Sequence, residues 1–126
     1  LQETGGWYVE PTVMTDVTPD MTVAQQEIFG PVVVAIPFDT EEEAIAIANG
    51  TEYGLAASVF TRDIDAAFRV ARAVQAGTVT VNCYGEGDIT TPFGGYKTSG
   101  FGGHEKGIEA FDQYTELKTT WVALGS

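Results

Sequence analysis

An apolar run with three consecutive valines constrains the fold of this chain more than any other feature. It covers residues 31–37 and is bounded by Pro31 and Pro37. A short run that is apolar at every position is typical of a strand buried on both faces, as found in parallel sheets. A second, short strand is predicted at residues 11–17, which mix β-branched residues with turn formers. Because parallel strands need a crossover connection, usually a helix, the run implies an α/β organisation.

A helix is predicted directly after this strand. Thr40 and Glu43 have the spacing of a capping box, and the acidic first turn suits the positive end of the helix dipole. Asn49-Gly50 is a typical stop signal. The expected buried stripe consists of Ala44, Ile45, Ile47 and Ala48.

The same alternation then repeats. Residues 55–61 are predicted to form a strand, Asp63 to cap a second helix, and Gly77 to end it. Residues 78–82 alternate between polar and apolar side chains, as a strand does. The order strand, helix, strand, helix, strand predicts βαβ units and a mainly parallel sheet.

The last part of the chain is irregular. Residues 85–107 are too rich in glycine for a helix or a sheet interior. Residues 105–113 are predicted to form a short helix, and residues 115–124 a final strand with Trp121 near its centre. This strand has no evident partner in the chain. Because an unpaired strand exposes backbone donors and acceptors, we expect it to pair with another subunit or with a part of the protein absent from this sequence.

Composition narrows the class of protein. The chain has 126 residues, of which 44% are hydrophobic, enough for one small globular domain with a core of its own. The net charge of −12 and the scattered lysines and arginines argue against nucleic acid and anionic membranes. No apolar run approaches the roughly 18 residues that span a bilayer. These features predict a soluble protein without a nucleic-acid or membrane partner.

The chain start and the single cysteine add two expectations. Leu1 is not an initiator methionine and does not begin a signal peptide, which suggests that the chain was cut from something longer. Cys83 is the only cysteine, so no internal disulfide forms and a cytoplasmic location is expected.

Four motifs occur in order along the chain. They are residues 6–13, 27–31 (Glu-Ile-Phe-Gly-Pro), 49–57 and 92–100 (beginning Pro-Phe-Gly-Gly-Tyr-Lys). Through them residues 6–124 resemble the end of an aldehyde dehydrogenase subunit. The resemblance implies a partial three-layer α/β catalytic domain with a mainly parallel sheet. Residues 1–101 would belong to that domain, including its substrate-tunnel loop, and residues 102–126 would form a helix and a strand for oligomerisation.

The resemblance also implies binding roles for individual residues. Glu27 matches the glutamate that binds the nicotinamide ribose of NAD or NADP, and a carboxylate can accept from both ribose hydroxyls. Phe29 matches the residue that packs near the nicotinamide. Phe93 matches the aromatic wall of the tunnel for a small aldehyde. Plain packing roles for both phenylalanines, and a surface role for Glu27, remain alternatives.

The tunnel entrance suggests a substrate class. Glu86 and Asp88 lie just before Phe93, and two carboxylates there would favour a cationic aldehyde such as an aminoaldehyde. Residues 88–93 look most like the γ-glutamyl-γ-aminobutyraldehyde dehydrogenases of putrescine, hence polyamine, breakdown. The alternative is a solvated acidic loop without a binding role.

The family's chemistry requires residues that this chain does not contain. The nucleophilic cysteine and the general-base glutamate are expected before Leu1, in the amino-terminal part of the same subunit, together with the dinucleotide-binding domain. Cys83 lacks basic neighbours in the sequence that would lower its pKa, so it is not expected to be the nucleophile. No catalytic residue and no metal site are predicted here, and the chain alone is expected to be inactive.

Two further hypotheses remain open. The chain could be a stand-alone interaction module that acts through residues 115–124, and the same strand in the family joins subunits into homo-oligomers. A small cysteine enzyme that uses Cys83 and His104 ranks last. His104 stands near the position where the family usually has an arginine, and an exposed loop histidine is the simpler explanation of it.

Overall fold

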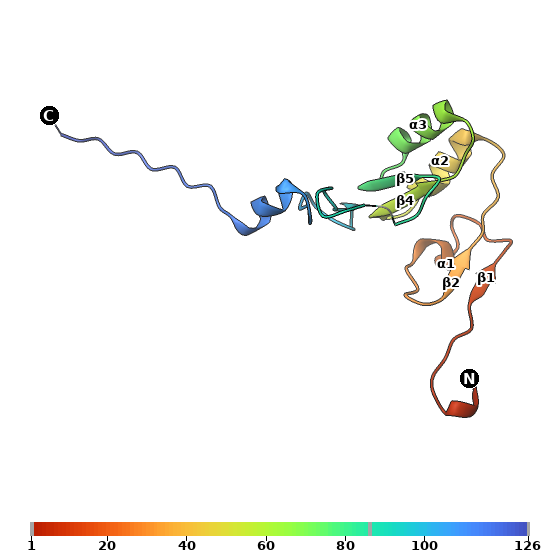
Figure 1. Cartoon of the computed structure of the whole chain (residues 1–126). Coiled ribbons are helices and arrows are strands. Elements are labelled where there is room, and N and C mark those ends of the chain that lie inside the picture. Colours follow the sequence, from red (N-terminus) through yellow and green to blue (C-terminus); the bar gives the residue numbers. More distant parts are fainter. Residues whose placement is uncertain (1, 86, 126) are drawn as a thin grey trace. The chain divides into compact units, whose positions relative to one another are not determined.

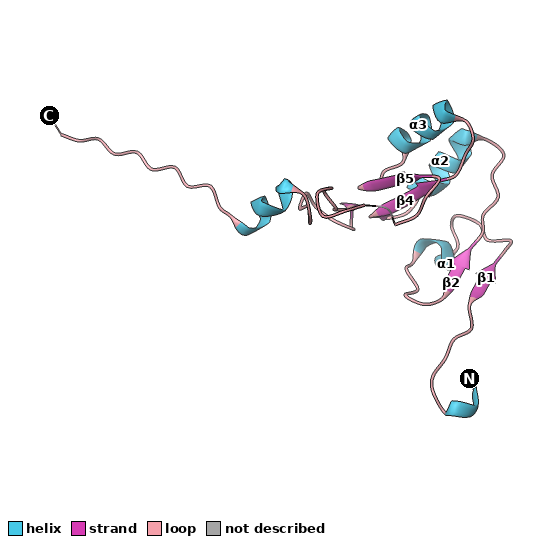
Figure 2. Ribbon diagram, in the orientation of Figure 1, coloured by secondary structure: helices cyan, strands magenta, loops and turns pink. Residues whose placement is uncertain are grey.

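The computed structural model describes residues 2–85 and 87–125 and shows an α/β protein with parallel strand pairs. The chain divides into two compact units, the first ending at Glu52 and the second beginning at Tyr53. Figure 1 labels most of their helices and strands, and Figure 2 colours them by type.

The first unit is built around one pair of parallel strands. β1 (Thr12–Met14) pairs with β2 (Val32–Val34), with Val13 opposite Val33. The unit also contains the short 3₁₀ helix η1 (Gln2–Thr4), α1 (Thr22–Gln25) and α2 (Glu41–Asn49).

The predicted burial of β2 on both faces is wrong for this chain. Val33 is 58% exposed, and the valines on either side of it are half-buried. The β1–β2 sheet has two strands, and among the described residues no further strand extends it. The apolar run therefore forms a strand, but its two faces are not fully buried by neighbouring elements as they normally are in a parallel sheet.

The predicted cap of α2 is confirmed. The Thr40 hydroxyl accepts a hydrogen bond from the Glu43 backbone N–H at 3.1 Å, and the Glu43 carboxylate accepts one from the Asp39 N–H at 2.8 Å. Gly50 is the C-cap residue, and its N–H donates to the carbonyl of Ile47. The Thr40 side chain thus satisfies one free N–H group of the first turn, and the Glu43 side chain binds the N–H of the residue that precedes the cap.

The second unit contains a βαβ element. β4 (Ala56–Val59), α3 (Ile64–Ala73) and β5 (Thr78–Val81) follow one another, and β4 pairs parallel with β5 (Figure 2). β3 (Tyr53–Gly54) pairs antiparallel with β6 (Tyr96–Lys97), and the 3₁₀ helix η2 covers Ile108–Tyr114.

The start of α3 is as predicted, but its end is not. The Asp63 carboxylate accepts hydrogen bonds from the N–H groups of Asp65 and Ala66 at 2.9 and 3.2 Å. The helix ends at Ala73, because Val74 is already extended, and not at Gly77. Gly77 instead begins the approach to β5, where its N–H donates to the carbonyl of Gly54.

Three other expectations differ from the structure. The predicted single sheet is three two-stranded sheets within the described residues. The helix expected at residues 105–113 is the later 3₁₀ helix η2. Residues 115–125 continue from an extended Thr115 without an assigned strand, since a strand is defined by a hydrogen-bonded partner and the described part of the chain provides none (Figure 1).

The chain does not bury a core of its own, contrary to expectation. Among the described residues, the buried apolar ones are Val17, Ala67 and Ala76. The accessible surface is 10572 Å². Two separate globular units of these sizes would together expose roughly 8,000 Å². The chain therefore exposes roughly 2,500 Å² more surface than two such units would, an area the size of a permanent protein interface.

Candidate functional site

The glycine-rich loop is fixed by contact between backbones. A Cβ on Gly77 would overlap the carbonyl oxygen of Gly94, and one on Gly94 would lie 2.5 Å from the carbonyl oxygen of Gly103. A Cβ on Gly100 would lie 2.7 Å from the carbonyl oxygen of Gly95. Because only glycine permits such approaches, the end of the loop is seated directly on the start of β5.

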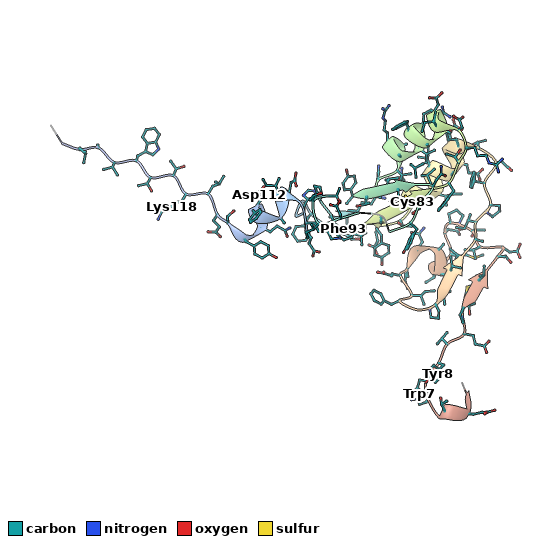
Figure 3. The ribbon with its side chains drawn as sticks, viewed as in Figure 1. Trp7, Tyr8, Cys83, Phe93, Asp112 and Lys118 are labelled. Atoms are coloured by element: carbon teal, nitrogen blue, oxygen red, sulfur yellow. The ribbon has the colours of Figure 1, made fainter. Side chains whose placement is uncertain are left out.

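Phe93 is held at both of its backbone groups. Its N–H donates to the carbonyl of Glu105 and its carbonyl accepts from the Glu105 N–H, each at 2.7 Å. The side chain, labelled in Figure 3, is half-buried. The Lys106 Nζ lies 5.4 Å from the centre of its ring. The predicted tunnel residue is therefore fixed in position by its backbone while its ring faces a cation.

A cavity of about 610 Å³ lies within the second unit, and its lining is mostly apolar. It is bordered by both strands of the β4–β5 sheet and by Tyr84, Pro92, Phe93 and Lys106. Its volume lies in the range of small-molecule pockets. The structure thus places Phe93 on the wall of a space that a small apolar ligand could fill.

Asp88 shapes its own loop. Its carboxylate accepts from the Thr90 N–H at 2.7 Å and from the Thr90 hydroxyl, and its backbone N–H donates to the Thr91 hydroxyl. The Thr90 hydroxyl and N–H are the main causes that lower the pKa of Asp88, and the charge of Lys106 adds to them. The carboxylate is exposed and charged at neutral pH. Glu86, its predicted companion, lies outside the described residues.

Glu27 and Phe29 follow α1 in the first unit. Both side chains are exposed, Phe29 by 92%, and the Glu27 carboxylate has no hydrogen bond or ion pair among residues 2–85 and 87–125. Phe29 has a φ of 58°, a conformation that costs a side-chain-bearing residue free energy. The turn is anchored because Thr12 donates to the Pro31 carbonyl at 2.8 Å.

The structure groups these residues by unit. Glu27 and Phe29 share one turn, and Phe93 and Asp88 share the glycine-rich loop. An exposed carboxylate two residues before an exposed aromatic ring suits a ribose and its attached ring, and the cofactor contact of this turn stays a prediction. Metal binding has no such support, because no cluster of three or more metal-ligating side chains occurs among the described residues.

Cys83 and His104 do not form a site. Cys83 is half-buried after β5, and its carbonyl accepts from the Thr80 hydroxyl at 2.9 Å (Figure 3). His104 is half-buried rather than exposed as expected, because it packs beside Gly94, where its Cδ2 would be 3.2 Å from an added Cβ. Its carbonyl accepts from the Gln113 side chain. No hydrogen bond joins the two in the described part of the chain.

Sequence reasoning overlooked Asn82 and Lys106. The Asn82 side-chain amide exchanges two hydrogen bonds of 2.9 Å with the Thr61 backbone and so ties the end of β5 to the segment after β4. The sequence did offer a signal, an asparagine at the end of a strand, because asparagine tolerates the positive φ that Asn82 adopts, 56°. Lys106 could not be found in this way, because its contact with Phe93 is non-local.

Comparison with known proteins gives the family. The sequence model of the aldehyde dehydrogenase family matches residues 1–120. The aminoacetaldehyde dehydrogenase of Pseudomonas aeruginosa is 56% identical over 117 residues, which are 93% of this chain and 24% of that protein. The betaine aldehyde dehydrogenase of Brucella anthropi is 51% identical over 120 residues, 95% of this chain and 24% of that protein.

A solved structure agrees with these matches. The P. syringae indole-3-acetaldehyde dehydrogenase, in complex with NAD+ and IAA, superimposes with a TM-score of 0.90 at 58% identity, covering 98% of this chain and 25% of that one. The chain belongs to the aldehyde dehydrogenase family. It spans about a quarter of the length of the relatives it matches. No helix in the described residues is long and apolar enough to cross a membrane.

Proposed function

We propose that this chain supplies the carboxy-terminal quarter of an NAD(P)-dependent aldehyde dehydrogenase that oxidises an aldehyde to a carboxylate. The family match over residues 1–120 carries this proposal. The surplus exposed surface and the many exposed large apolar side chains support it, because such a surface needs a cover, which the preceding part of the same subunit would provide. Alone, the chain is inactive, since the nucleophile and the general base belong to that preceding part.

In this proposal the first unit contacts the cofactor. NAD(P) accepts the hydride from the substrate when it is bound. The Glu27 carboxylate accepts hydrogen bonds from the two hydroxyls of the nicotinamide ribose, and the exposed ring of Phe29 packs beside it. The exposure of both side chains and the lack of a described partner for Glu27 support these roles.

The second unit forms the substrate wall. The Phe93 ring lines the cavity and excludes water from the aldehyde, and the two backbone hydrogen bonds of Phe93 keep the ring in place.

Residues 115–124 pair with a neighbouring subunit in a homo-oligomer. Their exposed side chains support this role, with Leu117 at 108% and Trp121 at 92% exposure. We place the protein in the cytoplasm, consistent with its one free cysteine.

The substrate class we propose is a small aldehyde whose binding depends on charge at the tunnel mouth. Asp88 is charged there, and Glu86 adds a second carboxylate in the sequence. An aminoaldehyde fits this charge. The likeness of residues 88–93 to γ-glutamyl-γ-aminobutyraldehyde dehydrogenases makes polyamine breakdown one candidate setting. Relatives named for aminoacetaldehyde and betaine aldehyde support cationic substrates more broadly.

A chimeric enzyme tests the proposal. This chain replaces the matching quarter of the P. aeruginosa relative, and oxidation of aminoacetaldehyde is followed by NADH absorbance. We expect a folded and active chimera, because 56% of the matched positions are identical. A folded chimera that binds NAD+ and oxidises no aldehyde contradicts the proposal.

The same chimera tests Glu27. Glu27→Gln keeps the size of the side chain and removes its charge, so the KM for NAD+ should rise by roughly ten- to a hundredfold, the effect of losing charge-assisted hydrogen bonds. Glu42→Gln, at an exposed glutamate of α2, is the matched control and should change nothing measurable. Equal KM values for the two variants refute the role of Glu27.

A stand-alone interaction module is the second candidate function. The observation that favours it is the exposed apolar segment of residues 115–124. It predicts that the isolated chain forms stable oligomers that are lost when these residues are deleted, as measured by sedimentation. Oligomers that survive the deletion exclude this candidate.

A further inference from the structure

Lys106 has a backbone conformation that lysine rarely adopts. Its φ is 61°, and Gly107 follows with a φ of 64°. A residue with a side chain is strained in this region and persists there only where the surroundings enforce it. The surroundings do so here, because Glu105 is paired with Phe93 on one side and the Gly107 N–H donates to the Ile89 carbonyl at 2.8 Å on the other.

These anchors direct the side chain of Lys106 to the cavity. Its ammonium nitrogen lies 5.4 Å from the centre of the Phe93 ring, within the distance at which a cation is attracted to an aromatic face. Lys106 and Phe93 both line the cavity of about 610 Å³. The ammonium also acts on the carboxylate of Asp88, whose pKa it helps to lower.

A cationic aldehyde would need the same two partners. An ammonium or quaternary ammonium head is recognised by an aromatic face and by a carboxylate. The ring of Phe93, which lines the cavity, and the carboxylate of Asp88, in the loop between the lining residues Gly87 and Thr91, are the candidates, and the charge of Lys106 already acts on both. A second cation at the ring meets a like charge and finds the aromatic face taken.

We propose that Lys106 is a specificity-determining residue, which weakens the binding of cationic aldehydes by holding its own ammonium group against the ring of Phe93. The inference rests on the proposed aldehyde oxidation. Because the ammonium of Lys106 competes with a cationic substrate, the carboxylates at the tunnel mouth do not by themselves make the enzyme strongly selective for cationic aldehydes. Neutral aldehydes are not affected in this way, because they do not compete for the charge-binding partners.

The test uses the intact enzyme that carries this chain and two aldehydes of the same shape. Betaine aldehyde has a trimethylammonium head, and tert-butylacetaldehyde replaces the nitrogen with carbon and is neutral. In Lys106→Met the ratio of kcat/KM for the cationic over the neutral aldehyde should rise by roughly three- to tenfold, the effect of freeing one cation–π site. The change should appear in the KM of betaine aldehyde and not in kcat, because ground-state binding is altered.

Two further variants distinguish the effect of losing the positive charge from the effect of a disturbed backbone. Lys106→Arg keeps a cation above the ring and should leave the ratio unchanged. Lys106→Asn removes the charge, but asparagine adopts a positive φ readily, so it should raise the ratio even if the methionine variant folds poorly. An unchanged or lowered ratio in the folded neutral variants overturns the inference. If the unaltered enzyme oxidises neither aldehyde, the proposed function itself fails and this inference fails with it.

Discussion

Gly77 offers the sharpest test of how the loop is held, because its substitution forces backbone against backbone. In Gly77→Ala the added Cβ would stand 2.7 Å from the carbonyl carbon of Gly94 and 3.3 Å from the Cα of Gly95. Ordinary contact begins at 3.4 Å, and the carbonyl oxygen of Gly94 lies closer still, so the Gly94 peptide must move by well over the ~0.7 Å that its carbonyl carbon alone requires. No side-chain rotation can relieve this clash.

The cost follows from overpacking. Inserting a methyl group into a closely packed site costs about 3 kcal/mol when the neighbours are rigid. The lower entropy of the unfolded alanine variant returns about 0.4–1 kcal/mol. The net loss is therefore about 2–3 kcal/mol, equivalent to a fall of about 5–10 °C in the melting temperature of a domain of 150–250 residues.

The assay is differential scanning fluorimetry of the intact enzyme, with kcat/KM for a neutral aldehyde as a second readout. Activity should fall as well, because the displaced Gly94 adjoins Phe93. Gly125→Ala is the control, since nothing lies within 4 Å of its added Cβ. A melting temperature and an activity equal to those of the control would refute the account of the loop as seated on β5.

Two further predictions concern polar contacts in the second unit. Asn82→Ala removes both hydrogen bonds to Thr61 and should destabilise the β4–β5 end by about 2 kcal/mol, seen as faster hydrogen exchange of the Thr61 amide; unchanged exchange contradicts the bridging role. The second concerns acid: the pKa of Asp88 is lowered from 3.8, chiefly by the Thr90 hydroxyl, so the loop is stabilised above that value and loses this support as the pH falls through the lower folded-state pKa. Amide chemical shifts of Thr90 should report this transition, Asp88→Asn should abolish it, and a Thr90 shift that titrates in the variant would refute the assignment.

The sequence predicted features that depend on near neighbours. The caps at Thr40 and Asp63 follow from short-range chemistry, and both are present. The end of α3 was misjudged because Gly77 resembles a helix stop while its actual role is set by Gly94, a distant residue. The valines of β2 predicted full burial, since that pattern reflects the surroundings of a complete sheet that the described residues do not form.

The residues of the candidate site likewise fall into two groups, those that sequence motifs predicted and those whose conformation depends on distant residues. Glu27, Phe29 and Phe93 were found through motifs, and their roles stay predictions. Phe29's positive φ and the position of Lys106 over Phe93 were not foreseeable, because the hydrogen bonds that anchor their neighbours Pro31 and Glu105 join segments apart in the sequence. Asp88 was foreseen as a charge for a ligand, whereas its carboxylate is also engaged by Thr90.

The glycine contacts below the loop have a consequence for protein engineering. The loop is held by contacts between main-chain atoms of Gly77, Gly94 and Gly103. These contacts involve no side chain and so do not determine which aldehyde is bound. Among the described residues of the loop, Tyr84, Pro92 and Phe93 border the cavity. A library that randomises positions 84–91 and keeps Gly77, Gly94 and Gly103 would therefore change the substrates that the enzyme accepts while the backbone packing that holds the loop is retained.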